Sequence, residues 1–226
     1  MEHKTYRGKV AYIGDEVGER GREWFAVTRH PSGSRTMQAM CEIDDKAVLR
    51  DVTYSVNESW QPLDAFVRLT VKDTFMGSGW FRFTENLAEC ESFMADGGRV
   101  SQKMEVSGRI PFFGAHPVAG DCWCLGGFER KSGERVQVLR GGMMSSQLSN
   151  GASGPMLSKM DLAIEYLGQQ EVSVPAGTFQ TEHFRFLLED RPAEDLWVHG
   201  EDLLIVKIRW DLLATTYQLV SLEGYY

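Results

Sequence analysis

Short strand-like segments, separated by glycine-rich or acidic turns, recur along the whole sequence. Segments such as 64–72 and 79–85 combine β-branched and aromatic residues with alternating polar positions, which is the pattern of half-buried strands. The turn Asp96-Gly97-Gly98 is typical of a hairpin, because glycine adopts positive φ at little cost. We therefore expect a series of strands, mostly joined as consecutive hairpins, from 6–13 at one end to 215–222 at the other.

Helical patterns are scarce, and the serine-rich stretch 145–157 contains two glycines and a proline that discourage a long helix. The sequence predicts an all-β fold, a curved antiparallel meander forming a barrel or half-barrel with few short helices. The length of 226 residues and the 42% hydrophobic content suit a single β-barrel-like domain over 1–226. The stretch 145–157 could mark an internal seam, and its glycine-rich part 150–155 could be either a lid or a disordered connection.

The overall charge and the ends of the chain narrow the class of protein. A formal net charge of −8 argues against a general nucleic-acid binder, because phosphate neutralisation needs an excess of lysine and arginine. No apolar run approaches the roughly 20 residues of a membrane span, and the first residues lack the apolar core of a secretory signal. We expect a cytoplasmic protein without a membrane span, whose cysteines are thiols packed in the core: Cys41, Cys90, Cys122 and Cys124.

The last third of the chain contains Val174-Pro175-Ala176-Gly177-Thr178-Phe179, Leu196-Trp197-Val198 and Leu204-Ile205-Val206-Lys207-Ile208. These segments resemble the V-P-A-G-x-F start of one strand and the two later strands of uncharacterised bacterial half-barrel domains, which are grouped loosely with LolA-like lipoprotein carriers. The resemblance covers about the last 60 residues. It implies a concave sheet around an apolar cavity able to hold an oily ligand, and it carries over no catalytic residue. The chain departs from those relatives in lacking a signal peptide and in having Ile205-Val206 where a proline is common.

Several strand segments carry an arginine inside an apolar run, and alternation places each arginine on the same face as the residues two positions away. A guanidinium group is costly to desolvate without a partner, so it must reach water, a carboxylate or a ligand. If these faces line the concavity, they suit an aromatic or fatty carboxylate, which arginine binds bidentately. If they face solvent, they form an ordinary polar exterior. The candidate ligand-binding residues are Arg68 with Phe66, Arg82 with Trp80, Arg185 and Arg209.

The central loop 109–121 is apolar and aromatic, is held by two prolines, and carries His116 and Asp121. His116 could act as a general acid or base with Asp121 orienting it, because imidazole titrates near neutral pH. Alternatively, the loop plugs one end of a barrel and His116 caps a turn. The segment that follows, 121–130, is expected to form a strand.

His183 shares a predicted strand face with Thr181 and Arg185. Inside a cavity, this face would offer a proton-transfer group beside an anion anchor; outside, it would be a polar surface. We expect no metal site, because the Cys122-x-Cys124 pair has no second ligand pair. We also expect no cofactor, because phosphate-binding and dinucleotide-binding motifs are absent.

Three functions remain open from the sequence. The first is binding of a hydrophobic, anionic small molecule in a β-barrel cavity. The second is a cofactor-independent enzyme (an isomerase, lyase, decarboxylase or hydratase) in which His183 or His116 moves protons and Arg68 or Arg82 holds a carboxylate. The third is an assembly protein whose aromatic residues form a subunit interface, with a homodimer as one outcome.

Overall fold

The computed structural model describes residues 2–148, 151–189 and 191–224, and its strands form one 15-stranded sheet. The strands are β1 (Lys4–Gly14), β2 (Gly18–Arg29), β3 (Arg35–Ile43), β4 (Val48–Val56), β5 (Pro62–Val71), β6 (Thr74–Phe83), β7 (Leu87–Met94), β8 (Gly98–Glu105), β9 (Phe113–Gly114), β10 (Val136–Met144), β11 (Ser158–Val174), β12 (Gly177–Leu187), β13 (Glu194–His199), β14 (Leu204–Trp210) and β15 (Thr215–Gly224). The helices are α1 (Val118–Asp121) and the 3₁₀ turns η1 (Asp44–Lys46), η2 (Cys122–Gly127), η3 (Arg130–Ser132) and η4 (Asp211–Leu213).

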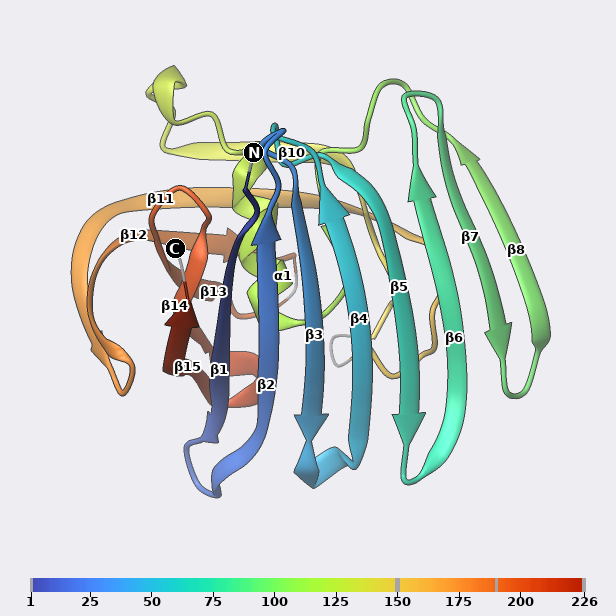
Figure 1. Cartoon of the computed structure of the whole chain (residues 1–226), viewed down its shortest axis with the longest axis horizontal. Helices are drawn as coiled ribbons and strands as arrows, with labels where there is room; N and C mark the ends of the chain where they lie inside the picture. Colours follow the sequence, from blue (N-terminus) through green and yellow to red (C-terminus); the bar gives the residue numbers. More distant parts are fainter. Residues whose placement is uncertain (1, 149–150, 190, 225–226) are drawn as a thin grey trace.

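Two meanders make up the sheet. Strands β1 to β8 pair in sequence order, strands β10 to β15 do the same, and the antiparallel pairing of β1 with β15 joins the two halves. Among the strands that the structure describes, only the short pairing of β9 with β10 is parallel. The sheet is curved and does not close on itself, so the predicted all-β meander in the form of a half-barrel is confirmed. In Figure 1, β1 to β8 stand side by side, while β11 and β12 run across them and curve strongly around the region of α1.

The two faces of the sheet differ as alternation predicts. On β4, Val48, Arg50, Val52 and Tyr54 are buried, and the residues that alternate with them are only partly covered. The same period of two appears on β5, where Ala65 and Val67 are buried. We call the buried side the inner face and the opposite side the outer face.

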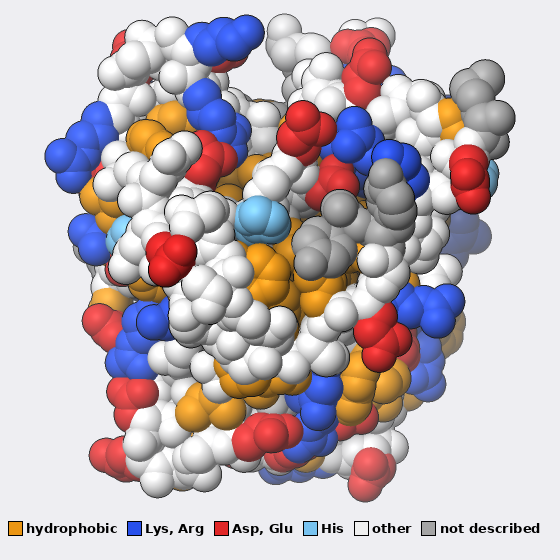
Figure 2. All heavy atoms as spheres, turned by 60° about the vertical axis from the view of Figure 1, so that its left-hand side comes forward, with side chains coloured by type: hydrophobic (Ala, Val, Ile, Leu, Met, Phe, Trp, Pro, Cys, Tyr) orange, Lys and Arg blue, Asp and Glu red, His pale blue; other side chains and the backbone are white. Residues whose placement is uncertain are grey.

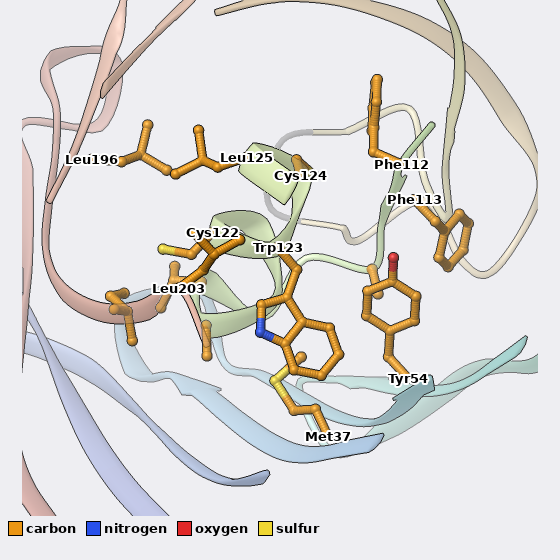
Figure 3. Packing of buried hydrophobic residues seen from close by; sticks show 14 of the residues in the cluster. Met37, Tyr54, Phe112, Phe113, Cys122, Trp123, Cys124, Leu125, Leu196 and Leu203 are labelled. Carbon is orange, nitrogen blue, oxygen red and sulfur yellow. The ribbon is translucent and has the colours of Figure 1, made fainter. Parts of the chain in front are cut away.

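The segment between β8 and β10 lies inside the curve of the sheet, where α1 and η2 form what we call the plug (Pro117–Gly127). Figure 3 shows Trp123 pointing toward Met37 and Leu125 lying beside Leu196, so the plug contacts both halves of the sheet. The expectation of a strand over 121–130 is wrong. Successive residues of the plug from Cys122 to Leu125 are all buried, because the sheet surrounds them and leaves no solvent side on which polar residues could alternate.

A close approach fixes the plug against the N-terminal half. A side chain at Gly126 would collide with the indole ring of Trp60, so only glycine fits there. Trp60 itself stacks edge-on against Trp123, with ring centroids 5.7 Å apart, and the guanidinium of Arg35 lies 4.0 Å above its ring. Arg35 also donates to Asp202 at 2.7 Å, which links β3 to the turn between β13 and β14.

All four cysteines are free and buried, so the prediction of core thiols is confirmed, although Cys122 and Cys124 lie in η2 and not on a strand. Within 145–157, Pro155 packs on the inner face of β6, where a Cβ at Gly79 would lie 2.8 Å from the Cβ of Pro155. The described part of this stretch therefore covers the sheet as a packed segment. The assignment of a single domain stays a prediction.

Candidate functional site

The plug is held by one buried carboxylate of the sheet. Glu23 on β2 is fully buried, and its carboxylate accepts the hydroxyl of Tyr12 at 2.9 Å. It also accepts the backbone N–H groups of Val118 at 2.8 Å and Ala119 at 3.0 Å, which are the unpaired donors at the start of α1. Burial raises the pKa of Glu23, and these hydrogen bonds oppose that rise. The strand thus positions the plug through charge-assisted hydrogen bonds.

A cavity of about 940 Å³ opens beside the plug, between it and the inner face of the C-terminal strands. This volume lies at the upper end of the range of ligand pockets. Apolar side chains make much of its wall: Phe112, Met160, Leu162, Phe186, Trp210 and Leu213. On the face shown in Figure 2, hydrophobic side chains are visible near the centre, and charged side chains are spread around them.

Three polar groups face this cavity from different elements: Asp121 at the end of α1, Glu194 at the start of β13, and Tyr217 on β15. Glu194 is only 9% exposed. Within the described ranges, neither carboxyl group nor the Tyr217 hydroxyl has a hydrogen-bond partner. The oxygens are therefore available to whatever occupies the cavity.

The protonation of the two carboxyl groups follows from their surroundings. Burial raises the pKa of Asp121 to about 7, with the nearby carboxylate of Glu23 adding to the rise and Arg50 opposing it. Burial also raises the pKa of Glu194 well above its usual range, and Asp121 contributes to that rise. Two acids that share an apolar site resist being charged together.

Most of the basic side chains around the cavity lie at its rim and already have partners or water. Arg20 forms an ion pair with Asp45 at 2.7 Å, and Arg140 forms one with Asp161 at 3.2 Å. Lys159 is exposed. Arg50 differs because it is buried; it donates to the backbone carbonyl of His116 at 3.5 Å.

The structure places His116 and Asp121 on the same cavity but does not pair them. His116 has a left-handed backbone conformation with φ of 74°, and its Nε2 lies 3.0 Å from the carbonyl oxygen of Leu148. Its Nδ1 lies 3.1 Å from the hydroxyl of Ser145. Because a carbonyl only accepts, the neutral ring donates from Nε2 and accepts at Nδ1. Burial lowers the pKa of His116 to about 3, with the charge of Arg50 adding to the effect, so the ring is neutral and fully engaged as a brace for the 145–148 segment.

Arg68 and Arg82 lie on the outer face, away from the cavity. Their strand neighbours Val67 and Phe81 are the buried residues, whereas Phe66 is 43% and Trp80 is 42% exposed. The expectation that these arginines and aromatic rings line the concavity does not agree with their placement. Alternation holds as predicted, but the aliphatic residues occupy the inner face and leave the arginines outside.

Arg185 and Arg209 also lie outside the cavity and are engaged by carboxylates. Arg185 donates to Asp195 at 3.0 Å, and Asp195 lies 2.7 Å from Nε2 of His183. The His183 ring stacks on Trp197 with centroids 4.3 Å apart. His183 and Arg185 are thus brought together, but on the face opposite the buried Phe184 and Phe186.

Arg209 is held by two carboxylates, those of Asp15 at 2.6 Å and Asp211 at 2.7 Å. The four arginines do not converge. Among the residues named from the sequence as site candidates, only His116 and Asp121 line the cavity.

Sequence reasoning missed Glu23, Arg50, Glu194 and Tyr217. A signal for three of them was present in the alternation. Arg50 has the same parity as Val52, Glu23 the same parity as Phe25, and Glu194 the same parity as Leu196. All three are charged residues on the apolar face of a strand. The arginines first singled out have the opposite parity, between the apolar residues.

Comparison with known proteins supports the fold and no more. No protein-family model matches this chain, and no curated protein matches it. A crystal structure of a β-barrel-like protein of a domain of unknown function from Brucella abortus superimposes with a TM-score of 0.62 and 10% identity, covering 99% of this chain and 98% of that one. A protein of a different family of unknown function from Pseudomonas aeruginosa gives a TM-score of 0.48 with 12% identity over 84% of this chain and 90% of its own.

The likeness to the Brucella abortus structure confirms a barrel-like fold for this chain. The names of these two proteins do not mention the LolA-like carriers. No helix within the described ranges is long and apolar enough to cross a membrane. The cytoplasmic location stays a prediction.

Proposed function

We propose that this protein binds a hydrophobic small molecule in the cavity beside the plug. The observation that carries the proposal is the cavity of about 940 Å³ beside α1 and η2, with a wall rich in large apolar side chains. A fully packed half-barrel would fill this space with its own side chains. The resemblance of the last third to LolA-like half-barrels supports the same function.

The sequence also led to the expectation that the ligand is anionic. That part rested on arginines facing the cavity, and Arg68, Arg82, Arg185 and Arg209 lie outside it. The charge of the ligand must therefore be argued from the groups that do face the cavity, which are Asp121, Glu194, Tyr217, His116 and Arg50.

The proposal is tested by placing a larger side chain in the wall of the cavity. Met160 lines the cavity on β11, and Met160→Trp would occupy part of it. Met40→Trp is the matched control, because Met40 lies on the outer face and is exposed. Native mass spectrometry of the purified proteins should show a retained small molecule, or uptake of added 1-dodecanol, for the wild type and Met40→Trp, and reduced occupancy for Met160→Trp. Equal occupancy in all three proteins would contradict the proposal.

A cofactor-independent enzyme is the second candidate, and one observation favours it: the carboxyl group of Asp121 has a pKa near 7 in the cavity, which suits a general acid or base. The groups differ from those the sequence indicated, since His183 lies outside and both ring nitrogens of His116 are engaged. If a retained molecule is converted on incubation, Asp121→Asn should abolish the conversion even at ligand concentrations that saturate the variant. Conversion at the wild-type rate by Asp121→Asn would contradict this assignment.

The third candidate, an assembly protein, is favoured by apolar side chains on the outer face, among them Trp24, Met40, Phe66 and Trp80. Exposed patches of this kind often mark an interface. The same native mass spectra would show the oligomeric state, and Trp80→Ser should shift a dimer to a monomer. A wild-type protein that remains monomeric at tens of micromolar would rule this candidate out.

A further inference from the structure

We infer that the ligand of the cavity carries a basic amine, held as an ammonium group between the carboxylates of Asp121 and Glu194. This inference rests on the proposed function and specifies the chemical class of the ligand. It concerns the polar end of the cavity, where α1 packs against β14, the strand beside Glu194.

The first observation is that Glu194 is an unpartnered carboxyl group in an almost fully buried position. It is 9% exposed, it lines the cavity, and no described residue donates a hydrogen bond to it. Buried carboxyl groups are normally paired, because removing the charge from water costs several kcal/mol. Glu23 shows the normal case in this same fold, with four donors around its carboxylate.

The second observation is that a second carboxyl group shares the site. Asp121 comes from the plug, a different element, and its carboxyl group also faces the cavity without a described donor. Burial raises the pKa of both groups; Asp121 adds to the rise for Glu194, while Arg50 opposes the rise for Asp121. A single ammonium group between them would supply three N–H donors and one positive charge.

An anionic head group fits this end of the cavity poorly. It would have to keep both acids protonated, because like charges at close range in an apolar site repel strongly. The cations of the cavity wall are engaged elsewhere: Arg20 and Arg140 are paired with Asp45 and Asp161, and the buried Arg50 donates to the backbone carbonyl of His116. A neutral ligand would bring no positive charge to Glu194, whose charged neighbours Asp121 and Asp195 are both acidic.

The rest of the cavity wall indicates the chemistry of the remainder of the ligand. From Glu194 the cavity continues along Trp210, Phe186 and Leu162, which offer apolar contact. The class that meets both ends is therefore an amphipathic amine, with one cationic head and one apolar chain or ring system.

The experiment compares three probes of equal chain length: dodecylamine, 1-dodecanol and dodecanoate, titrated calorimetrically at pH 7.5 below their micellar concentrations. The full chain is used as wild type, Glu194→Gln, Asp121→Asn and Glu189→Gln. Glu189 is the matched control, because it lies on the same cavity but is exposed. We expect dodecylamine to bind wild type at least about tenfold more tightly than 1-dodecanol.

We expect Glu194→Gln and Asp121→Asn each to reduce the affinity for dodecylamine by about tenfold or more and to leave that for 1-dodecanol unchanged, while Glu189→Gln changes neither. The unchanged affinity for 1-dodecanol shows that the variants retain the folded cavity. If dodecylamine and 1-dodecanol bind equally, or dodecanoate binds most tightly, the inference is overturned and the proposed function stands. If none of the three binds, the proposed function itself fails.

Discussion

Glu23 on β2 accepts the backbone N–H of Val118 at 2.8 Å, and this hydrogen bond joins the interior of the N-terminal meander to the first residue of α1. The two residues are 95 positions apart in the sequence. One side chain therefore fixes where the plug begins, and the plug in turn forms one wall of the cavity. The position of Asp121 depends on the same contact, because Asp121 ends the short helix that Glu23 caps.

Loss of this anchor should destabilise the fold. Glu23→Gln keeps the shape of the side chain but offers one accepting oxygen where the carboxylate offers two, so one N–H of α1 faces an NH₂ group. We expect the free energy of unfolding at pH 7 to fall by about 2–3 kcal/mol, the cost of buried groups left unsatisfied. Urea denaturation followed by tryptophan fluorescence measures this change.

Glu42→Gln is the matched control for that measurement. Glu42 lies on β3 and pairs with Arg22 at 2.7 Å near the surface, where Arg22 has two further carboxylate partners. Its loss should cost about 0.5 kcal/mol or less. An equal effect of the two substitutions would show that Glu23 does not anchor the plug.

The contact between Gly126 and Trp60 should tolerate no side chain. Gly126→Ala would place a methyl group inside the Trp60 ring, so either the plug or the ring must move. We expect a loss of stability of about 2–4 kcal/mol, the cost of overpacking a well-packed core. Gly97→Ala in the β7–β8 turn is the control, because its Cβ would meet nothing nearer than 3.8 Å. Equal melting temperatures for the two variants would contradict the packing described.

The stability of the wild type should depend on pH through Asp121. Its pKa is raised from 3.8 to about 7 in the folded protein. Between these values the folded state keeps a proton that the unfolded chain has released, so the free energy of unfolding falls as pH rises from about 4 to about 7. Asp121→Asn removes this contribution, and we expect it to be about 2 kcal/mol more stable than wild type at pH 8, because water in the cavity reduces the full effect of the shift.

Chemical denaturation at pH 5 and pH 8 checks the Asp121 prediction. Glu23 and Glu194 have pKa values raised in the same direction, so the substitution should flatten the pH profile without abolishing the slope. Asp161→Asn, at an exposed ion pair with Arg140, should change stability little at either pH. A variant Asp121→Asn that is less stable than wild type at pH 8 would show that the carboxylate has a favourable partner there.

Arg82 should contribute nothing to binding in the cavity. Its guanidinium is on the outer face, 3.9 Å from Glu89. Arg82→Ala should leave the affinity for 1-dodecanol within twofold of wild type and change stability by about 0.5 kcal/mol or less, as for exposed ion pairs generally. A tenfold loss of affinity in calorimetry would place the ligand on the outer face.

The fold could be predicted from the sequence because strand periodicity and turn chemistry depend on residues that are close together in the sequence. The Asp96-Gly97-Gly98 turn and the alternation on β5 and β6 appear in the structure as expected. The plug could not be predicted, because its helix forms inside the curve of the sheet. The run from Cys122 to Leu125 is continuously apolar, and such a short run fits a buried strand and a buried helix equally well.

The site was predictable in part. His116 and Asp121 were found because a histidine and an aspartate stand out in an apolar loop, and both line the cavity. The prediction that the arginines line the cavity was wrong, because alternation shows which residues share a face of a strand but not which face lies inside the curve of the sheet. Glu194 has the parity of the buried Leu196 and Val198, but only the folded chain shows that it lies near Asp121.

The most direct test of the central claim is to locate a bound ligand by photolabelling. A dodecanol analogue with a diazirine at mid-chain would be irradiated with the purified protein, and the labelled peptides would be identified by mass spectrometry. We expect labels on the plug and on the cavity wall, in the peptides that contain Phe112, Met160 and Leu162. Labels confined to outer-face peptides around Trp24, Phe66 and Trp80 would contradict the cavity as the binding site.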